Sequence, residues 1–382
     1  MTRRSERAPA AHSQAVGSSV RTGAIMRGLR DMSPRPGAWI VCAALATGCC
    51  ATQPIGGEPP SGGGPPIHGD DREPRPTLPG VQPEFVVIDL EEVGMRLWPE
   101  PGPTAYVAPD ERQTAAVTTL VRGMLADPPA PRDELAAAAS AAGFVLEGWS
   151  VDGRRYLAAV EQETRRGGGG AYVVRFDPPA PTAPPVPPTI LQAPHGFFDL
   201  GTERIALEIL LSEPDWPRAL FVNTVHRYLG ADGVRRRQQA SPADPCHSAQ
   251  HLLAVATAAA LDAHPNAEII QLHGFGDNDD TVMGPQPAAI VSAGLAEAPT
   301  PRSRVLAARL REALGVEVAL FPVDTDRLGA TTNVQGRVVH ARGGAEFIHI
   351  EMSGSLRQWL RNDAAARARL ATALRRDPPG SP

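Results

Sequence analysis

The chain has 382 residues with 37 Gly and 40 Pro, and its formal net charge is −5. It contains no Lys, so every basic residue is Arg, which excludes a P-loop lysine, a Schiff-base lysine and a Ser-Lys dyad. The negative net charge gives no global positive field, so we expect no nucleic acid as a partner.

The first 49 residues are typical of a secretion leader. Residues 37–48 form an apolar run that is too short to cross a membrane, which takes about 20 residues. The small residues before Cys49 resemble the lipobox of a bacterial lipoprotein, although Ala46 stands where Leu is commonest. We therefore expect residues 1–49 to be a lipoprotein-type signal with a lipid on Cys49. An uncleaved anchor and a chance apolar patch are the alternatives.

A Pro- and Gly-rich stretch, residues 50–80, follows the leader and predicts a disordered tether. With the lipid on Cys49, this tether would hold a folded domain at a membrane of the cell envelope, facing the periplasm or the exterior. The pattern then changes, and we expect a single domain over residues 81–376. Its N-terminal part would be 81–186, and the core that carries the site would be 187–376.

The N-terminal part combines short apolar runs with Ala-rich segments. We expect strands at 85–88 and 171–176, helices at 110–126 and 132–142, and a hairpin formed by 144–149 and 154–160. The four glycines Gly167–Gly170 precede a strand and lack a Lys, so we interpret them as a flexible turn rather than a phosphate loop.

The second half of the domain alternates strands with helices. We expect strands at 189–193, 218–225, 267–272, 316–321 and 347–350, and helices at 201–212, 246–263, 301–314 and 354–376. This alternation predicts an α/β fold with a mixed, mostly parallel central sheet flanked by helices. The working residues of such sheets lie where strands end, so we looked there for a site.

Three of these strand ends carry residues that bind metals or transfer protons. His195 and His273 each follow an apolar strand and precede a Gly, and Glu351 ends a third strand. Asp199 lies four residues after His195. Two histidines and two carboxylates that converge at one edge of a sheet indicate a site.

The residue types fit a catalytic zinc. Zn²⁺ in enzymes commonly takes two His and one carboxylate and keeps a position for water, and a separate carboxylate then accepts the proton of that water. We expect His195, Asp199 and His273 to bind Zn²⁺ and Glu351 to be the general acid/base. Glu203 is the rival of Asp199 as third ligand, although it also suits the start of a helix.

Three segments, 193–202, 273–275 and 348–352, resemble poly-gamma-glutamate hydrolases, which are small relatives within the zinc carboxypeptidase superfamily. The shared features are a His-Gly opening, an acidic residue before Gly-Thr, a second His-Gly and a late Glu. The resemblance implies a mixed sheet flanked by helices, one Zn²⁺ and hydrolysis of an amide bond. This chain departs from the family because Asp199 replaces a Glu and lies one residue closer to His195.

The resemblance also implies a clamp for a substrate carboxylate. Zinc carboxypeptidases use an Asn-Arg pair for this role, and Asn223 and Arg227 are the matching candidates here. The alternative for Arg227 is a structural ion pair. Asn333 and Arg337, in a polar turn before the Glu351 strand, are further candidates for the lining of the pocket.

The helix expected over 246–263 carries two histidines four residues apart, His247 and His251. No Glu lies between them as in a helical zinc-protease motif, so we interpret them as surface or packing residues. Asp244 is the expected N-cap of this helix, and Cys246 is expected to be buried rather than nucleophilic.

The sequence therefore predicts a lipid-anchored, zinc-dependent hydrolase of an amide bond. The substrate would be a small peptide, an acyl-amino acid or a gamma-glutamyl compound. A serine hydrolase is not expected, because Gly148–Asp152 and Met352–Ser355 both fail the Gly-x-Ser-x-Gly pattern. The alternative is an envelope binding lipoprotein that keeps the fold without catalysis, and the Asp at position 199 favours it.

Overall fold

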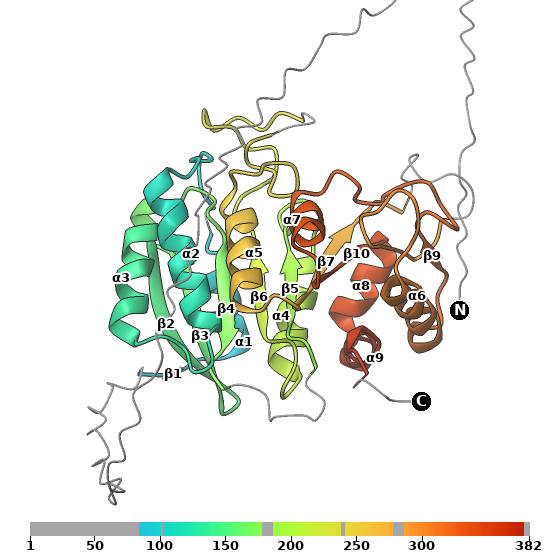
Figure 1. Cartoon of the computed structure of the whole chain (residues 1–382), viewed down its shortest axis with the longest axis horizontal. Coiled ribbons are helices and arrows are strands. Elements are labelled where there is room, and N and C mark those ends of the chain that lie inside the picture. The colour runs from blue at the N-terminus through green and yellow to red at the C-terminus, as the bar shows by residue number, and fades with distance from the viewer. Residues whose placement is uncertain (1–83, 101, 178–185, 238–240, 278–285, 378–382) are drawn as a thin grey trace, which may run out of the picture. The chain divides into compact units, whose positions relative to one another are not determined.

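The computed structural model describes residues 84–100, 102–177, 186–237, 241–277 and 286–377, which all belong to one compact unit within Pro74–Pro382 (Figure 1). The signal expected over 1–49, with Cys49, and the tether expected over 50–80 lie outside the described residues. Among the described residues, no helix has both the length and the apolar character that crossing a membrane requires.

Ten strands of the described residues form one sheet. They are β1 (Val86–Val87), β2 (Phe144–Val151), β3 (Arg154–Glu161), β4 (Ala171–Arg175), β5 (Thr189–Ala193), β6 (Ala219–Val222), β7 (Glu268–Gly274), β8 (Ala289–Ser292), β9 (Val318–Leu320) and β10 (Glu346–Met352). Their order across the sheet is β1-β2-β3-β4-β6-β5-β7-β10-β8-β9. Five of the nine neighbouring pairs are parallel, so the sheet is mixed and mostly parallel, as predicted.

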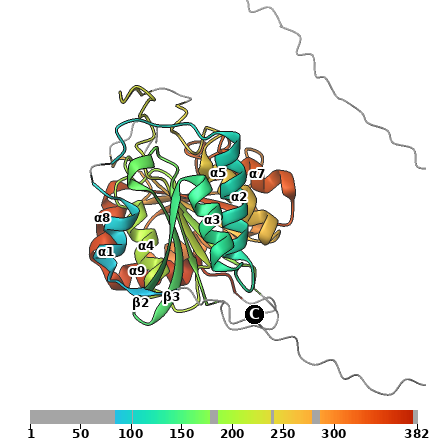
Figure 2. The same cartoon turned by 90° about the vertical axis from the view of Figure 1, so that its left-hand side faces the viewer.

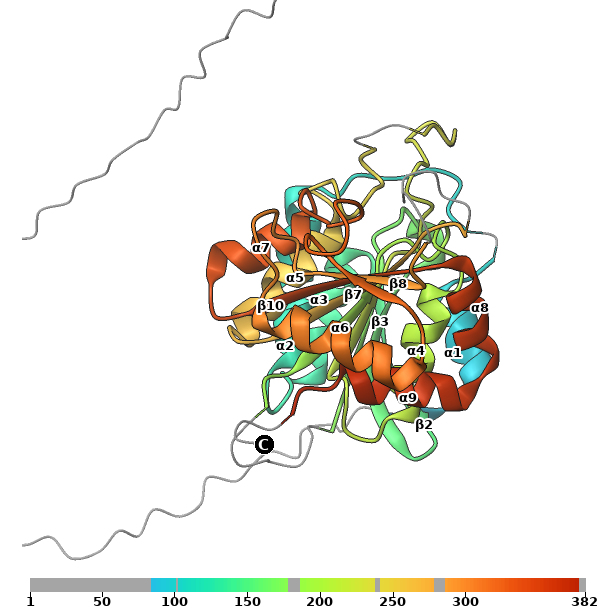
Figure 3. The ribbon, with the colours of Figure 1, turned by 90° about the vertical axis from the view of Figure 1, so that its right-hand side faces the viewer.

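Helices cover both faces of the sheet. They are α1 (Leu90–Leu97), α2 (Glu111–Leu125), α3 (Arg132–Ala142), α4 (Thr202–Ser212), α5 (Leu252–Ala263), α6 (Pro301–Leu314), α7 (Val334–Arg342), α8 (Gly354–Asn362) and α9 (Ala364–Leu374). One apolar core lies between the sheet and α1, α4, α6, α8 and α9. A second lies between the opposite face and α2, α3, α5 and α7 (Figures 2 and 3).

The strands β5, β7 and β10 form the parallel centre of the sheet. Every residue of β5 is buried, and so are nearly all residues of the other two, because helices cover both faces. Parallel pairing brings the carboxyl ends of all three strands to one edge. Polar residues at this edge therefore come together from distant parts of the chain.

The local signals of the N-terminal part are confirmed. The helices expected at 110–126 and 132–142 are α2 and α3, and the expected hairpin is the pair β2–β3. Asp152 and Gly153, which join these strands, have φ values of 49° and 76°. Positive φ at both positions is what a two-residue hairpin turn requires.

The helix expected over 246–263 begins only at Leu252. His251 Nδ1 accepts a hydrogen bond from the Leu253 N–H at 3.1 Å and so caps α5. The segment before His251 consists of turns, so His247 does not share a helical face with it. The expected N-cap role of Asp244 is therefore wrong.

The helix expected over 354–376 is two helices, α8 and α9. Asp363 ends the first and caps the second, since its side chain accepts a hydrogen bond from the Ala366 N–H at 2.9 Å. The sequence reasoning did not predict α1, β8 or α7. The start of α7 is set by Asn333, whose side chain accepts from the Gly336 N–H at 3.1 Å.

The glycine run Gly167–Gly170 surrounds a carboxylate of the protein itself. The N–H groups of Gly167, Gly168 and Gly169 donate to Glu161 Oε1 at 2.9, 3.0 and 2.9 Å. Successive backbone N–H groups form a concave anion site of this kind. The glycines therefore serve an internal contact, and no phosphate role follows from them.

Arg175, at the end of β4, is a buried structural cation that is only 3% exposed. Its guanidinium donates to five backbone carbonyl oxygens at the end of α4 and after it, those of Leu210, Glu213, Pro214, Trp216 and Pro217. We expect Arg175→Met to lower the free energy of unfolding by more than about 3 kcal/mol, since buried acceptors lose charged donors worth ~1.5–3 kcal/mol each.

Urea denaturation measures this effect, with Arg155→Met as the control. Arg155 pairs with Asp177 at the surface, where an ion pair contributes about 0–1 kcal/mol. Equal destabilisation by the two substitutions would contradict the structural role of Arg175.

Candidate metal centre

The carboxyl ends of β7 and β10 and the segment that follows β5 line a cleft of about 1020 Å³. His273 lies opposite Glu351 in the parallel pair β7–β10, and His195 follows β5 by two residues. The structure thus brings together the predicted residues of three strand ends. The cleft lining includes His195, Asp199, Arg227, His273, His349 and Glu351.

Asp199 lies between the two histidines. A turn in which the Asp199 N–H donates to the His195 carbonyl at 2.7 Å returns the carboxylate to the side of His195. Asp199 Oδ2 lies 3.4 Å from His195 Nδ1 and 3.3 Å from His273 Nδ1. The spacing of four residues therefore lets one carboxylate oxygen contact both rings.

Asp244 binds the opposite nitrogen of His195. Its Oδ1 is 3.0 Å from His195 Nε2, and Arg227 Nε donates to its Oδ2 at 2.8 Å. The Cys246 N–H donates to Oδ1 at 3.0 Å, and His247 Nδ1 lies 3.2 Å from Oδ2. A carboxylate acceptor at this place assigns the proton of His195 to Nε2, which leaves Nδ1 as an acceptor.

Gln271 provides the acceptor for Nε2 of His273, as Asp244 does for His195. The two residues lie on the same face of β7, and Gln271 Oε1 is 3.2 Å from His273 Nε2. Because an amide oxygen only accepts, the proton of His273 is assigned to Nε2. Both Nδ1 atoms then face Asp199 Oδ2 as acceptors.

Acceptors that face one another call for positive charge, and Arg227 Nη1, 3.2 Å from His195 Nδ1, supplies part of it. Donor atoms that share one tetrahedral zinc at 2.0–2.1 Å lie about 3.3–3.4 Å apart, and the two contacts of Asp199 have these lengths. The protein further fixes each ring through Nε2, as metal-binding histidines usually are fixed. The two contacts of Asp199 therefore fit a divalent cation shared with His195 and His273, although Asp199 is in neither of the two sets of three described donors that all lie within 4.8 Å of one another.

The shifted pKa values of the cluster point to the same need for positive charge. Burial lowers the pKa of both histidines, but Cys246 and Asp199 outweigh it and raise the pKa of His273 to about 9 and that of His195 well above its usual value. Burial raises the pKa of Asp199, but the hydrogen bonds to both rings lower it well below its usual range. In the protein alone, both histidines therefore favour the protonated form.

Glu351 is buried beside this cluster. Its Oε1 lies 3.5 Å from His349 Nε2, and its Oε2 has no hydrogen-bond partner among the described residues. Burial raises the pKa of Glu351 to about 7. A carboxyl group with a free oxygen and a pKa near neutrality is suited to accept and return a proton.

The thiol of Cys246 lies in the same cluster, which the sequence reasoning did not predict. Two sets of three donors approach within 4.8 Å among the described residues, His195 with Cys246 and His273, and His273 with His349 and Glu351. Cys246 Sγ lies 3.8 Å from His273 Nε2, on the edge of the ring that Gln271 also contacts. Because that edge carries the proton, we favour Asp199 over the thiol as the third donor.

Glu203 lies apart from the cluster. Its Oε2 accepts a hydrogen bond from the Gly201 N–H at 3.1 Å, next to the start of α4, and its side chain does not line the cleft. Burial raises the pKa of Glu203 to about 7. Of the two carboxylates considered from sequence, Asp199 is therefore the one that contacts both histidines.

The expected pairing of Asn223 with Arg227 is corrected by the structure. Asn223 is fully buried outside the cleft lining, and its amide binds the N–H and the carbonyl of Val225 at 3.2 and 2.8 Å. Arg227 does line the cleft, with its side chain 16% exposed, and it forms the ion pair with Asp244 that was the alternative. Arg227 therefore serves the cluster without Asn223.

Of the two candidates in the polar turn before the Glu351 strand, one lines the cleft and the other does not. Asn333 lines the cleft and donates from Nδ2 to Gln271 Oε1 at 2.8 Å. Arg337 donates to the Thr332 carbonyl at 2.9 Å and does not line the cleft.

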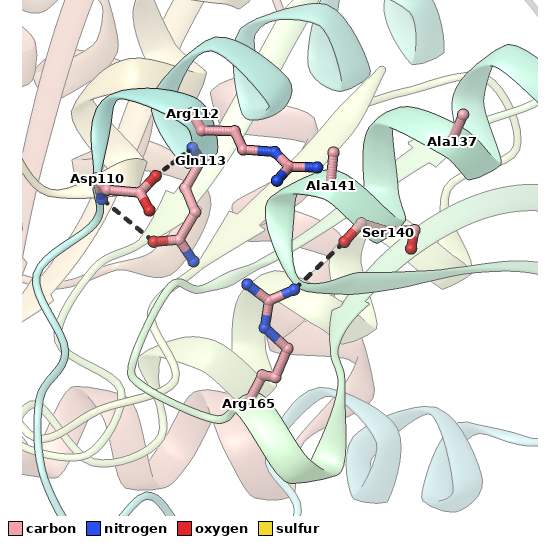
Figure 4. A pocket seen from close by; sticks show the side chains of 7 residues that line it. All are labelled: Asp110, Arg112, Gln113, Ala137, Ser140, Ala141 and Arg165. Atoms are coloured by element: carbon pink, nitrogen blue, oxygen red, sulfur yellow. Dashed lines mark hydrogen bonds between the residues drawn. The ribbon is translucent and has the colours of Figure 1, made fainter.

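A second pocket, of about 440 Å³, lies beside the start of α2 and the end of α3 (Figure 4). Asp110 and Gln113 form a reciprocal cap of α2, and Arg165 donates to the Ser140 carbonyl at 3.4 Å. These polar groups support helix ends, and the lining contains no His, Cys or Glu. The chemistry of the described residues therefore points to the cleft at the sheet edge.

Comparison with known proteins gives distant structural similarity only. No family model and no curated protein matches the chain. Similar solved structures include N-formylglutamate amidohydrolase from Ralstonia eutropha JMP134 (13% identity, 51% of this chain and 93% of that one, TM-score 0.35). Others are a metallo-carboxypeptidase from Burkholderia cenocepacia (13%, 53% and 60%, 0.33) and leucyl aminopeptidase from Trypanosoma brucei (10%, 67% and 60%, 0.34). At this level of similarity, the function of the chain is argued from its own residues.

The choice of third ligand gives a direct prediction. We expect Asp199→Asn to weaken zinc binding by more than about 100-fold, because loss of a residue that only hydrogen-bonds to a metal ligand already costs about 10–100-fold in affinity. We expect Glu203→Gln to leave the affinity near that of the parent protein. Competition with a chromogenic chelator measures both affinities. Loss of zinc from Cys246→Ala together with its retention by Asp199→Asn would assign the thiol instead.

Proposed function

We propose that the protein is a metal-dependent hydrolase that cleaves an amide bond and uses Zn²⁺. The observation that carries this proposal is the contact of Asp199 with both His195 and His273, next to the buried, partly unpaired carboxylate of Glu351. Two neutral imidazoles and one carboxylate are the donor set of many hydrolytic zinc sites.

When bound, the ion supplies a Lewis acid and a water whose pKa falls from 15.7 to about 7. Glu351, on the strand next to His273, would accept a proton from the attacking water and return it to the leaving nitrogen. Glu351 is 8% exposed and lines the cleft, so its carboxylate is largely shielded from bulk water while it stays open to the cleft. The proposed general acid/base is therefore Glu351.

Arg227 is the proposed group that polarises or orients the substrate. Asp244 binds its Nε and Nη2, and its Nη1 lies 3.2 Å from His195 Nδ1. The guanidinium also lies 5.4 Å from the ring centre of Phe198 and 5.2 Å from that of Tyr228. These contacts hold a fixed positive charge at the wall of the cleft, where an amide oxygen or a carboxylate would bind.

A peptide, an acyl-amino acid or a gamma-glutamyl compound is the proposed substrate class. It combines the amide bond that the site would cleave with a carboxylate for Arg227. The proposed place of action is the cell envelope, reached through the lipoprotein-type signal and the lipid on Cys49. This part of the proposal is supported by the sequence pattern of residues 1–49.

The role of Glu351 is tested by Glu351→Gln, which keeps the shape and removes the base. We expect hydrolysis of an amide library to fall by about 10²–10⁴ in kcat while zinc binding is retained, because the carboxylate is not one of the three ligands. Unchanged hydrolysis would remove Glu351 from the mechanism. If neither the parent nor the variant hydrolyses any amide while both bind zinc, the binding-lipoprotein alternative replaces the proposal.

The pH dependence follows from the same residue. Glu351 is a base only when ionised, and burial raises its pKa from 4.5 to about 7, while a nearby divalent cation favours the ionised form and lowers it. We therefore expect kcat/KM to fall as the pH drops, with a midpoint between these two values. A pH–rate profile measures the midpoint, and a value below that of an ordinary glutamic acid would contradict the burial argument.

A further inference from the structure

A row of buried amides lies beneath the candidate metal centre. Gln192 in β5 lies opposite Gln271 in the parallel pair β5–β7, and Gln335 of α7 and Thr257 of α5 flank them. All four side chains are fully buried. Burying so many polar groups costs free energy unless each is hydrogen-bonded, and the bonds in this row run in one direction.

The bonds form a chain that starts at the backbone of α5. Thr257 Oγ1 donates to the Leu253 carbonyl at 2.8 Å, and Gln192 Nε2 donates to Thr257 Oγ1 at 2.9 Å. Gln271 Nε2 then donates to Gln192 Oε1 at 2.8 Å. This leaves Gln271 Oε1 to accept from His273 Nε2 at 3.2 Å.

Each link determines the orientation of the next. The single hydroxyl hydrogen of Thr257 is used on a carbonyl, so its oxygen can only accept from Gln192. The amide group of Gln192 must then turn its oxygen to Gln271, and Gln271 must turn its own oxygen to His273. Turning either amide around would place two acceptors, or two donors, against each other in a dry interior.

We propose that this directional chain, ending at Gln271, sets the tautomer of His273 and thereby prepares its Nδ1 to bind the metal. Gln271 is then a positioning residue, because it touches neither the metal nor the substrate. The inference rests on the proposed function to the extent that His273 is a metal ligand. It adds that the affinity of the site depends on buried residues as distant as Thr257.

Asn333 strengthens the assignment. Its Nδ2 donates to the same Gln271 Oε1 at 2.8 Å, and its Oδ1 is used on the Gly336 N–H at the start of α7. The Asn333 amide is therefore also held in one orientation. This donor, at the cap of α7, is independent of His273 and identifies that atom of Gln271 as the acceptor oxygen.

Gln335 provides a matched control. It is as buried as Gln271, accepts from Gln271 Nε2 at 3.3 Å and donates to the Pro245 carbonyl at 2.8 Å. Its side chain makes no hydrogen bond to His273. Replacing either glutamine by methionine removes the same amide from the same buried layer, but only Gln271→Met removes the acceptor of the His273 proton.

The test compares the zinc affinities of the purified parent, Gln271→Met and Gln335→Met by chelator competition. We expect Gln271→Met to bind zinc about 10–100-fold more weakly than the parent, and Gln335→Met to stay close to the parent. Equal affinities of the two variants would overturn the inference while leaving the proposed function in place. A parent protein that binds no zinc would overturn the proposed function itself.

A second measurement is the position of the proton on the His273 ring in the zinc-loaded parent protein, determined by ¹⁵N NMR of the imidazole. A proton on Nε2 supports the inference, and a proton on Nδ1 overturns it.

If Gln271→Met does not fold, Thr257→Val and Thr257→Ser replace it, because serine keeps the hydroxyl that starts the chain and valine removes it. Weaker zinc binding by the valine variant alone supports the inference, and equal binding by both overturns it.

Discussion

The contact of Asp199 with the Nδ1 atoms of His195 and His273 is the constraint on which the rest of the site depends. One carboxylate oxygen at 3.3–3.4 Å from two ring acceptors is unfavourable without positive charge, of which Arg227 beside His195 Nδ1 supplies only part, so other parts of the protein must hold these groups there. The parallel centre of the sheet fixes the positions of these residues. It fixes the ends of three strands that are far apart in the chain, and helices on both faces leave the strands no room to shift.

The residues at the strand ends could be predicted because their signal is local. Each of His195, His273 and Glu351 follows a short apolar run, and parallel strands in an α/β sheet end at the same edge. The place of Asp199 depends on one turn after His195. The alternation of strands and helices likewise identified the fold class, although the short elements β8 and α7 carry too weak a pattern to be predicted.

The outer residues of the site could not be predicted because tertiary contacts decide them. Asp244 looked like a helix cap, but α5 starts eight residues later, and its carboxylate is held by His195 and Arg227 instead. Asn223 looked like a substrate ligand, but its amide closes a tight turn with Val225. Gln271 did leave a signal, since a polar residue two positions before His273 on a buried strand must point to the same face.

The charges of the cluster give a separate argument for a divalent ion. Asp199, Asp244 and Glu351 carry three negative charges when ionised, and Arg227 supplies one positive charge. Neutral histidines would leave an excess of two negative charges in a nearly dry site, which is costly. One divalent cation between His195 and His273 would cancel this excess. In the protein alone, the pKa values of both histidines are raised against burial by Cys246 and by the hydrogen bonds to Asp199, so their protons supply positive charge in place of the ion.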